Sequence, residues 1–323
     1  MSDNIEASRT RDKLKKKLLE YKAGSKIGLE NFTDAEQGEM DDFQIRIAIF
    51  GQTGTGKSAL INTIYKVLLS PDELPEEGEV AIVQSAGGEG TSILEEFFQE
   101  RGFTVVDTRG FFDIDNELEE TEFFRILYGT VKQGEEIDRQ DRGQSQTARA
   151  GKGGYRLNKP PISHQVHVVL WVIKGDDVRV LNEDYHQKLN FVLHRLGRES
   201  ITLLTVITHS DRIDSSKVEE VISKSREATK SLACHTFLVH NWIAGMSRLN
   251  AETEENVLTM LDTALECGER SVKIRQTKRR AEEIKAEKLE REIERSKVRM
   301  PKENVEELER LSNKNVNVVF NKF

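Results

Sequence analysis

Cysteine is nearly absent from this chain of 323 residues. Only Cys234 and Cys267 occur, too few for a disulfide framework or a cysteine-based metal cluster, and this usage is typical of a reducing compartment. Apolar runs are also short, and none approaches the ~20 residues that a membrane-spanning helix needs. The N-terminus has no apolar signal segment and no glycine at position 2 for myristoylation, and the C-terminus has no prenylation cysteine. We expect a cytoplasmic protein without a transmembrane segment; peripheral membrane association stays open.

An excess of positive charge is lacking too. The chain has 48 Lys and Arg against 56 Asp and Glu, a net charge of −8, which argues against general affinity for nucleic acid. Charged residues make up 32% of the chain and the mean hydropathy is −0.56, so much of the polarity must lie outside a core. The length suits one sizeable domain with appendages.

A phosphate-binding signature is present at residues 51–58, which read GQTGTGKS and fit the pattern G-x-x-x-x-G-K-[S/T]. A strand-like segment (43–50) runs into this loop and a helix-like segment (59–68) follows it, as the binding mechanism requires. The glycines let backbone N–H groups turn toward a phosphate chain, while Lys57 supplies a cation and Ser58 a hydroxyl for Mg²⁺. This context argues against the alternative, a chance match in a glycine-rich turn. The residues predicted to bind the nucleotide here are Gly51, Gln52, Thr53, Gly54, Thr55, Gly56, Lys57, Ser58 and Ala59.

Alternating strand-like and helix-like runs predict an α/β fold with a mostly parallel sheet. Two strands, 103–107 and the preceding 93–99, are joined by a short hairpin, so one strand must run antiparallel to the rest. The other strands are predicted at 43–50, 165–174, 201–208 and 236–240, and the helices at 59–68, 118–130, 183–196, 216–231 and 252–266.

Composition divides the chain into three parts. Residues 1–42 form a polar leader with a possible short basic helix at 9–21, which we place at the periphery. Residues 43–268 form the α/β domain, with a polar, glycine-rich mobile loop at about 133–161. Residues 269–323 form a charged helical C-terminal extension, in which interleaved Glu and Lys or Arg favour a solvated helix.

Two further segments are suited to the phosphate end of a nucleotide. Asp107 ends an apolar strand, where its carboxylate can hold Mg²⁺ through water, and Gly110 follows three residues later. A glycine there lets a backbone N–H approach the γ-phosphate, the contact that reports hydrolysis in switch loops. Upstream, Thr91 is predicted to supply a second Mg²⁺-binding hydroxyl, with Ser92 as the alternative. The predicted metal ligands are therefore Ser58, Thr91 and Asp107.

The segment 208–211, which reads THSD, ends another apolar strand. A carboxylate at this edge can accept two hydrogen bonds from guanine N1 and N2, a donor pair that adenine lacks. Asp211 could instead cap the next helix, but that helix is predicted to begin near Ser215, where Asp214 is better placed. The sequence therefore predicts guanine recognition by Asp211.

These motifs, in this order, resemble the translation-factor-related class of P-loop GTPases, and within it the branch of septins, GIMAP proteins and chloroplast import receptors. The sequence DTRGF (107–111) is similar to the D-T-P-G-[FL] segment of this branch, although Arg109 replaces the usual proline. The interferon-inducible GTPases are a competing neighbour. The resemblance implies GTP or GDP with Mg²⁺ as ligands, and a homodimer or oligomer formed through the GTPase domain. It also implies base contacts from Thr208, His209, Asp211, His240 and Asn241.

Slow hydrolysis is expected, because Phe111 stands where Ras-like proteins place the glutamine that orients water. The residues assigned to catalysis are Lys57, Thr91 and Gly110, with Arg109 as a candidate cation. Arg109 could equally face solvent or pair with a nearby aspartate, and His209 is a second candidate, acting across a dimer. We therefore expect a slow GTPase that self-associates. A GTP-binding scaffold with negligible turnover and, less favoured, a P-loop ATPase or kinase remain as alternatives.

Overall fold

In the computed structural model of the chain, the described residues are 2–28, 43–69, 80–81, 93–108, 110, 117–135, 160–177, 179 and 183–299. They belong to two compact units. The first consists of Met1–Asp141 and Pro160–Val272, and the second of Arg142–Lys159 and Lys273–Phe323. Within the second unit, the described residues 273–299 are helical.

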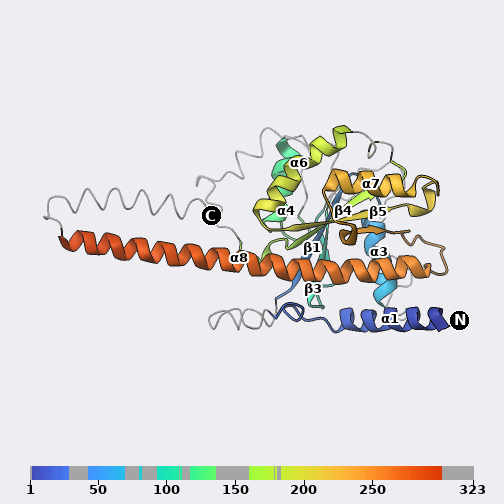
Figure 1. The fold of residues 1–323 in the computed structure, drawn as a ribbon, viewed down its shortest axis with the longest axis horizontal. Helices are drawn as coiled ribbons and strands as arrows, with labels where there is room; N and C mark the ends of the chain where they lie inside the picture. The colour runs from blue at the N-terminus through green and yellow to red at the C-terminus, as the bar shows by residue number, and fades with distance from the viewer. Residues whose placement is uncertain are drawn as a thin grey trace. The chain divides into compact units, whose positions relative to one another are not determined.

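A six-stranded sheet forms the centre of the first unit (Figure 1). The strand order is β2-β3-β1-β4-β5-β6, and β2 pairs antiparallel with β3 while the other pairs are parallel. The carboxyl ends of the five parallel strands therefore meet at one edge. The strands are β1 (Ile45–Gly51), β2 (Glu95–Phe97), β3 (Phe103–Asp107), β4 (Val168–Lys174), β5 (Thr202–Thr208) and β6 (Thr236–Leu238).

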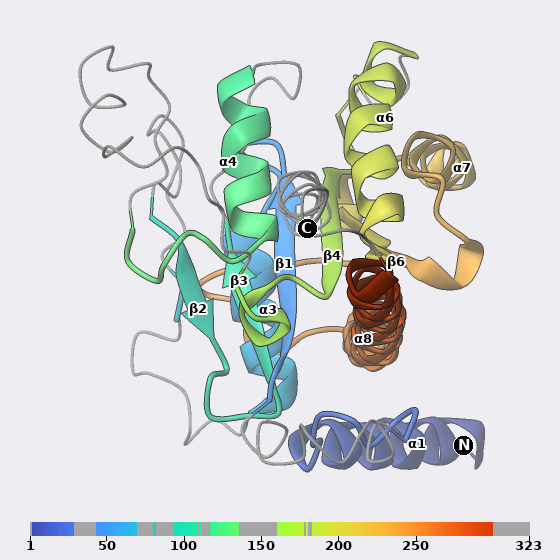
Figure 2. The same ribbon diagram turned by 90° about the vertical axis from the view of Figure 1, so that its left-hand side faces the viewer.

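Helices cover both faces of the sheet, which makes the first unit a three-layer α/β structure (Figure 2). One apolar cluster joins the sheet to α1, α3 and α8, and the other joins it to α4, α6 and α7. Successive side chains of a strand point to opposite faces of the sheet. In β1, Ile47 and Ile49 therefore belong to the first cluster, and Ala48 and Phe50 belong to the second. The helices are α1 (Ser2–Leu19), α3 (Lys57–Leu68), α4 (Glu117–Leu127), α6 (Glu183–Arg198), α7 (Val218–Thr229) and α8 (Ala251–Arg299).

The predicted fold class is confirmed: the sheet is mostly parallel, has one antiparallel strand and is followed by a C-terminal helix. The predicted helix at 252–266 and the helical extension predicted from residue 269 form one continuous element, α8, which runs to Arg299. The predicted loop at 133–161 lies mostly outside the described residues. Among the helices described, none is both long and apolar enough to cross a membrane.

The N-terminal segment makes buried contacts, although its polar composition predicts a peripheral position. Leu18 and Tyr21 belong to the apolar cluster around α8. Glu269 of α8 is fully buried and accepts hydrogen bonds from the Tyr21 hydroxyl (2.6 Å) and from the backbone N–H groups of Gly24 (2.9 Å), Lys26 (3.0 Å) and Ile27 (2.9 Å). Because a buried carboxylate needs such donors, this contact fixes the segment to α8.

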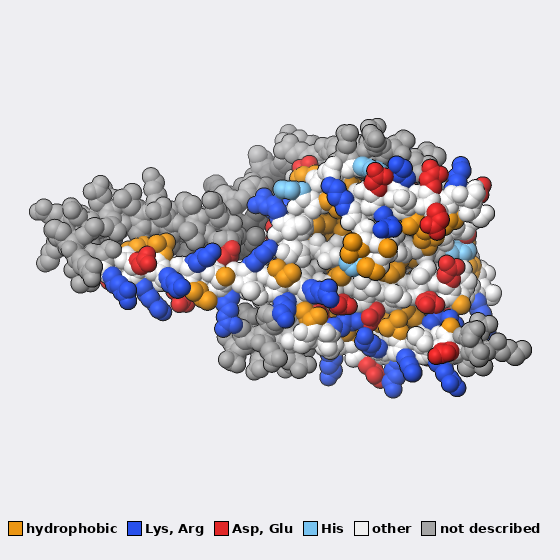
Figure 3. Space-filling model, in the orientation of Figure 1, with side chains coloured by type: hydrophobic (Ala, Val, Ile, Leu, Met, Phe, Trp, Pro, Cys, Tyr) orange, Lys and Arg blue, Asp and Glu red, His pale blue; other side chains and the backbone are white. Residues whose placement is uncertain are grey.

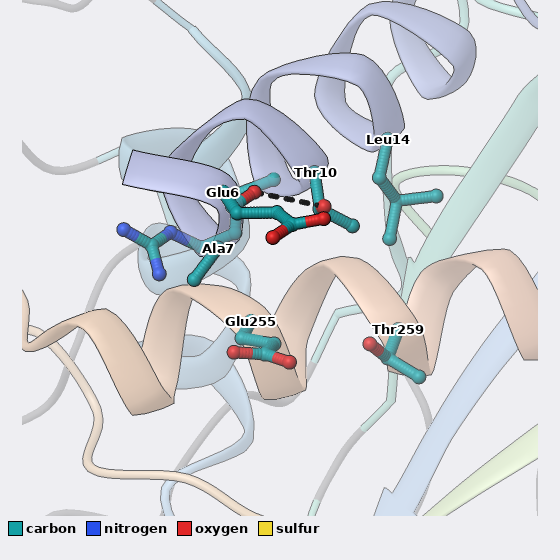
Figure 4. Close-up of a pocket in the computed structure, with 7 residues that line it drawn as sticks. Glu6, Ala7, Thr10, Leu14, Glu255 and Thr259 are labelled. Atoms are coloured by element: carbon teal, nitrogen blue, oxygen red, sulfur yellow. Dashed lines mark hydrogen bonds between the residues drawn. The ribbon is translucent and has the colours of Figure 1, made fainter. Parts of the chain in front are cut away.

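A pocket of about 330 Å³ lies between α1 and α8. Glu6, Thr10 and Leu14 line it from α1, and Glu255 and Thr259 line it from α8 (Figure 4). None of these lining residues belongs to the predicted nucleotide site. Lys and Arg side chains, with Asp and Glu among them, gather over α1 on the face shown in Figure 3.

Candidate functional site

The phosphate loop lies between β1 and α3, at the edge where the parallel strands end. Gly51 ends β1 so close to β4 that a Cβ would lie 2.4 Å from the carbonyl oxygen of Val172, a gap that only glycine allows. Gly56 precedes α3 in the left-handed conformation (φ 85°) and provides no side-chain cap for the helix. The N-terminal end of α3, where an anion is favoured, therefore lies directly after the loop.

The side chain of Lys57 is folded against this loop. It is 7% exposed, and its Nζ donates hydrogen bonds to the carbonyl oxygens of Gly51 (3.3 Å) and Gln52 (3.1 Å). The ammonium group is thus held beside the backbone of the phosphate loop.

Ser58 and Asp107 meet next to the loop. Ser58 Oγ donates a 2.8 Å hydrogen bond to Asp107 Oδ2, while Asp107 Oδ1 is buried without a hydrogen-bond partner among the described residues. Burial raises the pKa of Asp107 to about 6, although the nearby Lys57 and the Ser58 hydrogen bond lower it. A buried carboxylate oxygen that accepts no hydrogen bond, next to a hydroxyl group, offers oxygen ligands of the kind that Mg²⁺ prefers.

Gly110 rests directly on the phosphate loop. A Cβ at this position would lie 2.3 Å from Thr53 Oγ1 and 2.5 Å from Thr53 Cα. Because the backbone contact leaves no space for a side chain, the residue that was predicted to sense the γ-phosphate is glycine for a steric reason. Thr91 and Arg109, the other residues predicted in the two switch segments, lie outside the described residues.

Thr208 and His209, at the end of β5, also touch the phosphate loop. Thr208 Oγ1 lies 2.6 Å from the carbonyl oxygen of Thr55, to which it donates. His209 adopts the left-handed conformation (φ 54°), and its Cε1 would lie 3.4 Å from a Cβ built on Gly56. Burial lowers the pKa of His209, and the charges of Arg212 and Lys174 lower it further, which favours the neutral imidazole.

Asp211 lies in a short 3-10 turn (Ser210–Arg212) with a side chain that is 40% exposed. Asp211 Oδ1 is 3.6 Å from Nε2 of His240, the residue two positions after β6. The turn before α7 is stabilised by Asp214, which accepts the N–H of Ser216 at 2.9 Å. The carboxylate of Asp211 is therefore not used to start that helix and is partly exposed beside His240.

Asn241 follows His240 and is 7% exposed. Its Nδ2 donates a 2.9 Å hydrogen bond to the carbonyl oxygen of Gly56. Thr63 of α3 belongs to the same contact region, because its hydroxyl accepts the backbone N–H of Trp242 at 2.8 Å. Sequence reasoning missed Thr63, since a threonine inside a helix carries no signal of its own.

The structure thus brings the described predicted residues together at the carboxyl edge of the sheet. The phosphate loop contacts Gly110 on one side and Thr208, His209 and Asn241 on the other, and Ser58 joins it to Asp107. A phosphate chain and a purine base could be held side by side along this edge.

Comparison with known proteins identifies the family of the chain. The sequence model of the septin family matches residues 41–285. No curated protein matches the chain. Among solved structures, Toc33 from Arabidopsis thaliana in complex with GDP and Mg²⁺ is 18% identical, with a TM-score of 0.38, and the alignment covers 73% of this chain and 89% of that chain. A dimerization-deficient Toc33 mutant is 17% identical, with a TM-score of 0.37 and the same coverage.

The septin GTPase domain from Chlamydomonas reinhardtii is 15% identical, with a TM-score of 0.39, and the alignment covers 74% of this chain and 98% of that chain. The family assignment rests on the sequence match, which includes the phosphate loop, Asp107, Asp211 and Asn241 and extends over more than half of the chain. The resemblance to this branch is thereby confirmed. The chain belongs to the septin family and carries its P-loop GTPase domain.

Proposed function

We propose that the chain binds GTP and GDP together with Mg²⁺ and hydrolyses GTP slowly to GDP and phosphate. The observation that carries this proposal is the buried Asp107 Oδ1, which has no hydrogen-bond donor among the described residues and lies beside Ser58 and the phosphate loop. Ser58 and Asp107 would hold the ion, Asp107 through water, with Thr91 as a further ligand. Bound Mg²⁺ would neutralise charge on the phosphate oxygens.

Base selection is assigned to Asp211, whose carboxylate can accept from guanine N1 and N2. Thr208, His209 and His240 complete the proposed base end. His209 replaces the lysine that usually packs over the base in this class, and its neutral ring can stack on guanine. We therefore expect weaker affinity with guanine specificity retained.

Slow turnover is proposed because Phe111 has no group that could orient a water molecule. Lys57 and Gly110 would bind the phosphates, and a further cation would have to come from Arg109 or from a second copy of the chain. For the second route we propose Arg179. Arg179 follows β4 at the same edge, has a side chain that is 59% exposed and is oriented by its ion pair with Asp177 (2.6 Å).

Self-association through the GTPase domain accordingly belongs to the proposal, with a homodimer as its simplest form. The test measures GTP hydrolysis against protein concentration. A rate per subunit that climbs steeply with concentration and falls in Arg179→Ala supports catalysis completed by a partner. A flat rate near zero would contradict it and favour the alternative function, a GTP-binding scaffold whose assembly is the activity.

Direct binding tests the nucleotide assignment itself. Calorimetric titration of the full chain with GTP, GDP and ATP, each with and without Mg²⁺, should show guanine binding that weakens without the ion. Equal affinity for ATP and GTP would overturn the role of Asp211 and restore the ATPase alternative.

A further inference from the structure

Two side chains hold the phosphate loop at neighbouring carbonyl groups. Thr208 Oγ1 lies 2.6 Å from the carbonyl oxygen of Thr55, and Asn241 Nδ2 lies 2.9 Å from that of Gly56. A carbonyl oxygen can only accept a hydrogen bond, so the nitrogen of the Asn241 amide must face the loop. The next residue, Lys57, begins α3. Both contacts thus fix the backbone immediately before the helix end that would bind phosphate.

The segment that carries Asn241 is also fixed to α3 through Thr63. The Thr63 hydroxyl is fully buried, accepts the N–H of Trp242 at 2.8 Å and donates to the carbonyl oxygen of Ala59 at 2.7 Å. Its only hydrogen is therefore used within the helix, and the 3.4 Å approach to Asn241 Oδ1 contributes little. Trp242 and Asn241 thus attach one loop to α3, through Thr63, and to the phosphate loop, through Gly56.

Burial and packing turn the Asn241 amide away from the base end. Its side chain lies against the left-handed Gly56, where a Cβ would come within 2.8 Å of Nδ2. Asp211 and His240, by contrast, are 40% and 31% exposed at the outer edge. A role for Asn241 beside the guanine ring, as the sequence resemblance implied, would require the amide to give up its contact with Gly56.

We propose that Asn241 is a positioning residue for the phosphate loop. It acts through the carbonyl group of Gly56, whose peptide carries the N–H of Lys57, and so holds the start of α3 in the orientation that receives phosphate. It touches no reacting atom and does not select the base. This inference rests on the proposed binding of guanine nucleotides and assigns one part of that site.

Base selection and phosphate binding can be separated with inosine nucleotides, which lack the 2-amino group of guanine. The dissociation constants of fluorescent GTP, GDP and ITP are measured for the full wild-type chain and for Asn241→Ala. Loss of one neutral hydrogen bond should weaken the binding of all three by about threefold to tenfold and leave the GTP to ITP ratio unchanged. A changed ratio, or unchanged affinities, would overturn the inference.

Asn241→Asp gives a test of opposite sign. A carboxylate facing the carbonyl oxygen of Gly56 is repelled, so this variant should bind every nucleotide more weakly than the alanine variant, again with a constant GTP to ITP ratio. If the side chain instead accepted hydrogen bonds from guanine, the aspartate would keep or raise the preference for GTP over ITP, and the inference would fail.

Thr63→Val keeps the shape of the side chain but removes the acceptor for Trp242, so it should reproduce the loss for GTP and ITP with the same ratio. The matched control is Thr259→Val, at an exposed position on α8. Thermal unfolding shows whether each variant is folded. If Asn241→Ala does not fold, the GTP to ITP ratio of Thr63→Val tests the inference in its place. A wild-type chain that binds no guanine nucleotide would remove the proposed function itself, whereas a changed ratio removes only this inference.

Discussion

Asp211 and His240 come from separate loops and approach within 3.6 Å at the outer edge of the sheet, measured from Asp211 Oδ1 to His240 Nε2. Asp211 follows β5, and His240 follows β6, the strand that pairs with β5. The parallel pairing therefore brings an acceptor and an aromatic ring to the same place, where a purine would need both.

Replacing Asp211 should remove the preference for guanine. Asp211→Ala loses the acceptor for N1 and N2 and should lower the GTP to ATP affinity ratio by about tenfold or more, because a bidentate pair contributes ~1–3 kcal/mol of base discrimination. Competition between the two nucleotides, followed by fluorescence, measures the ratio. Asp214→Ala, whose carboxylate stabilises the next turn, is the control and should keep the guanine preference. An unaltered ratio in Asp211→Ala would refute this role.

Mg²⁺-dependent binding should respond to acid. Burial raises the pKa of Asp107 to about 6 from an ordinary value of 3.8, and a protonated carboxyl cannot serve the cation. The Mg²⁺-dependent part of GTP affinity should be constant above pH 7 and fall as the pH drops through 6. Asp107→Asn should weaken Mg²⁺-dependent binding at every pH and abolish this dependence. Titrations from pH 5 to 8 measure how the Mg²⁺-dependent affinity changes with pH. If Asp107→Asn showed the same change, another group would be responsible for it.

A lower pH should weaken Mg²⁺-dependent binding, but it should increase the contribution of Asp107 to the free energy of unfolding. Between pH 3.8 and about 6 the native state keeps a proton on Asp107 that the unfolded chain has lost. The contribution of Asp107 to the free energy of unfolding therefore falls as the pH rises through this window. Urea unfolding without nucleotide or Mg²⁺ should show Asp107→Asn gaining stability relative to wild type as the pH rises. A constant difference between the two proteins would contradict this.

Gly110 should be intolerant of any side chain. Gly110→Ala places a Cβ 2.3 Å from Thr53 Oγ1 and 2.5 Å from Thr53 Cα, so the backbone near the γ-phosphate must move. We expect GTP affinity to fall more than GDP affinity, which fluorescence titration measures. Gly197→Ala is the matched control, because a Cβ at that position in α6 meets nothing within 4 Å. Equal losses for GTP and GDP would argue against a role at the γ-phosphate.

Glu269 should contribute strongly to stability. In Glu269→Gln the charge disappears and an amide N–H₂ group opposes buried N–H donors, which should lower the free energy of unfolding by about 3 kcal/mol. Tyr21→Phe removes one charge-assisted hydrogen bond and should cost about 2 kcal/mol. Denaturant unfolding measures both. Lys13→Ala, on an exposed part of α1, should change little, and an equally small effect of Glu269→Gln would refute the buried contact.

The sequence predicted the central strands well because burial on both faces produces continuous apolar runs. Strand β3 was predicted with its exact bounds, and β5 began one residue later than expected. The continuity of α8 was not predicted: the helix at 252–266 and the charged helical extension from residue 269 were assigned separately, because apolar residues beyond residue 272 are sparse. Arg279 and Glu283 instead pair four residues apart along this helix (3.1 Å).

Side-chain contacts between distant segments were the least predictable part of the site. The pattern THSD predicted Asp211 as a site residue because a carboxylate just after a parallel strand lies at the edge of the sheet where nucleotides bind. Nothing in the residue types of Thr63 or Asn241 indicates that one binds the backbone of Trp242 and the other that of Gly56. Such contacts depend on how β6 and α3 are placed by the whole sheet.

The matched septin region begins at residue 41 and includes Glu269, yet every hydrogen-bond donor given above for this carboxylate lies between Tyr21 and Ile27. A protein cut at the family boundary would keep the acceptor and lose its donors. The first compact unit accordingly begins before the family match, and we expect a protein that retains the first 28 residues to be more stable than one cut at residue 41.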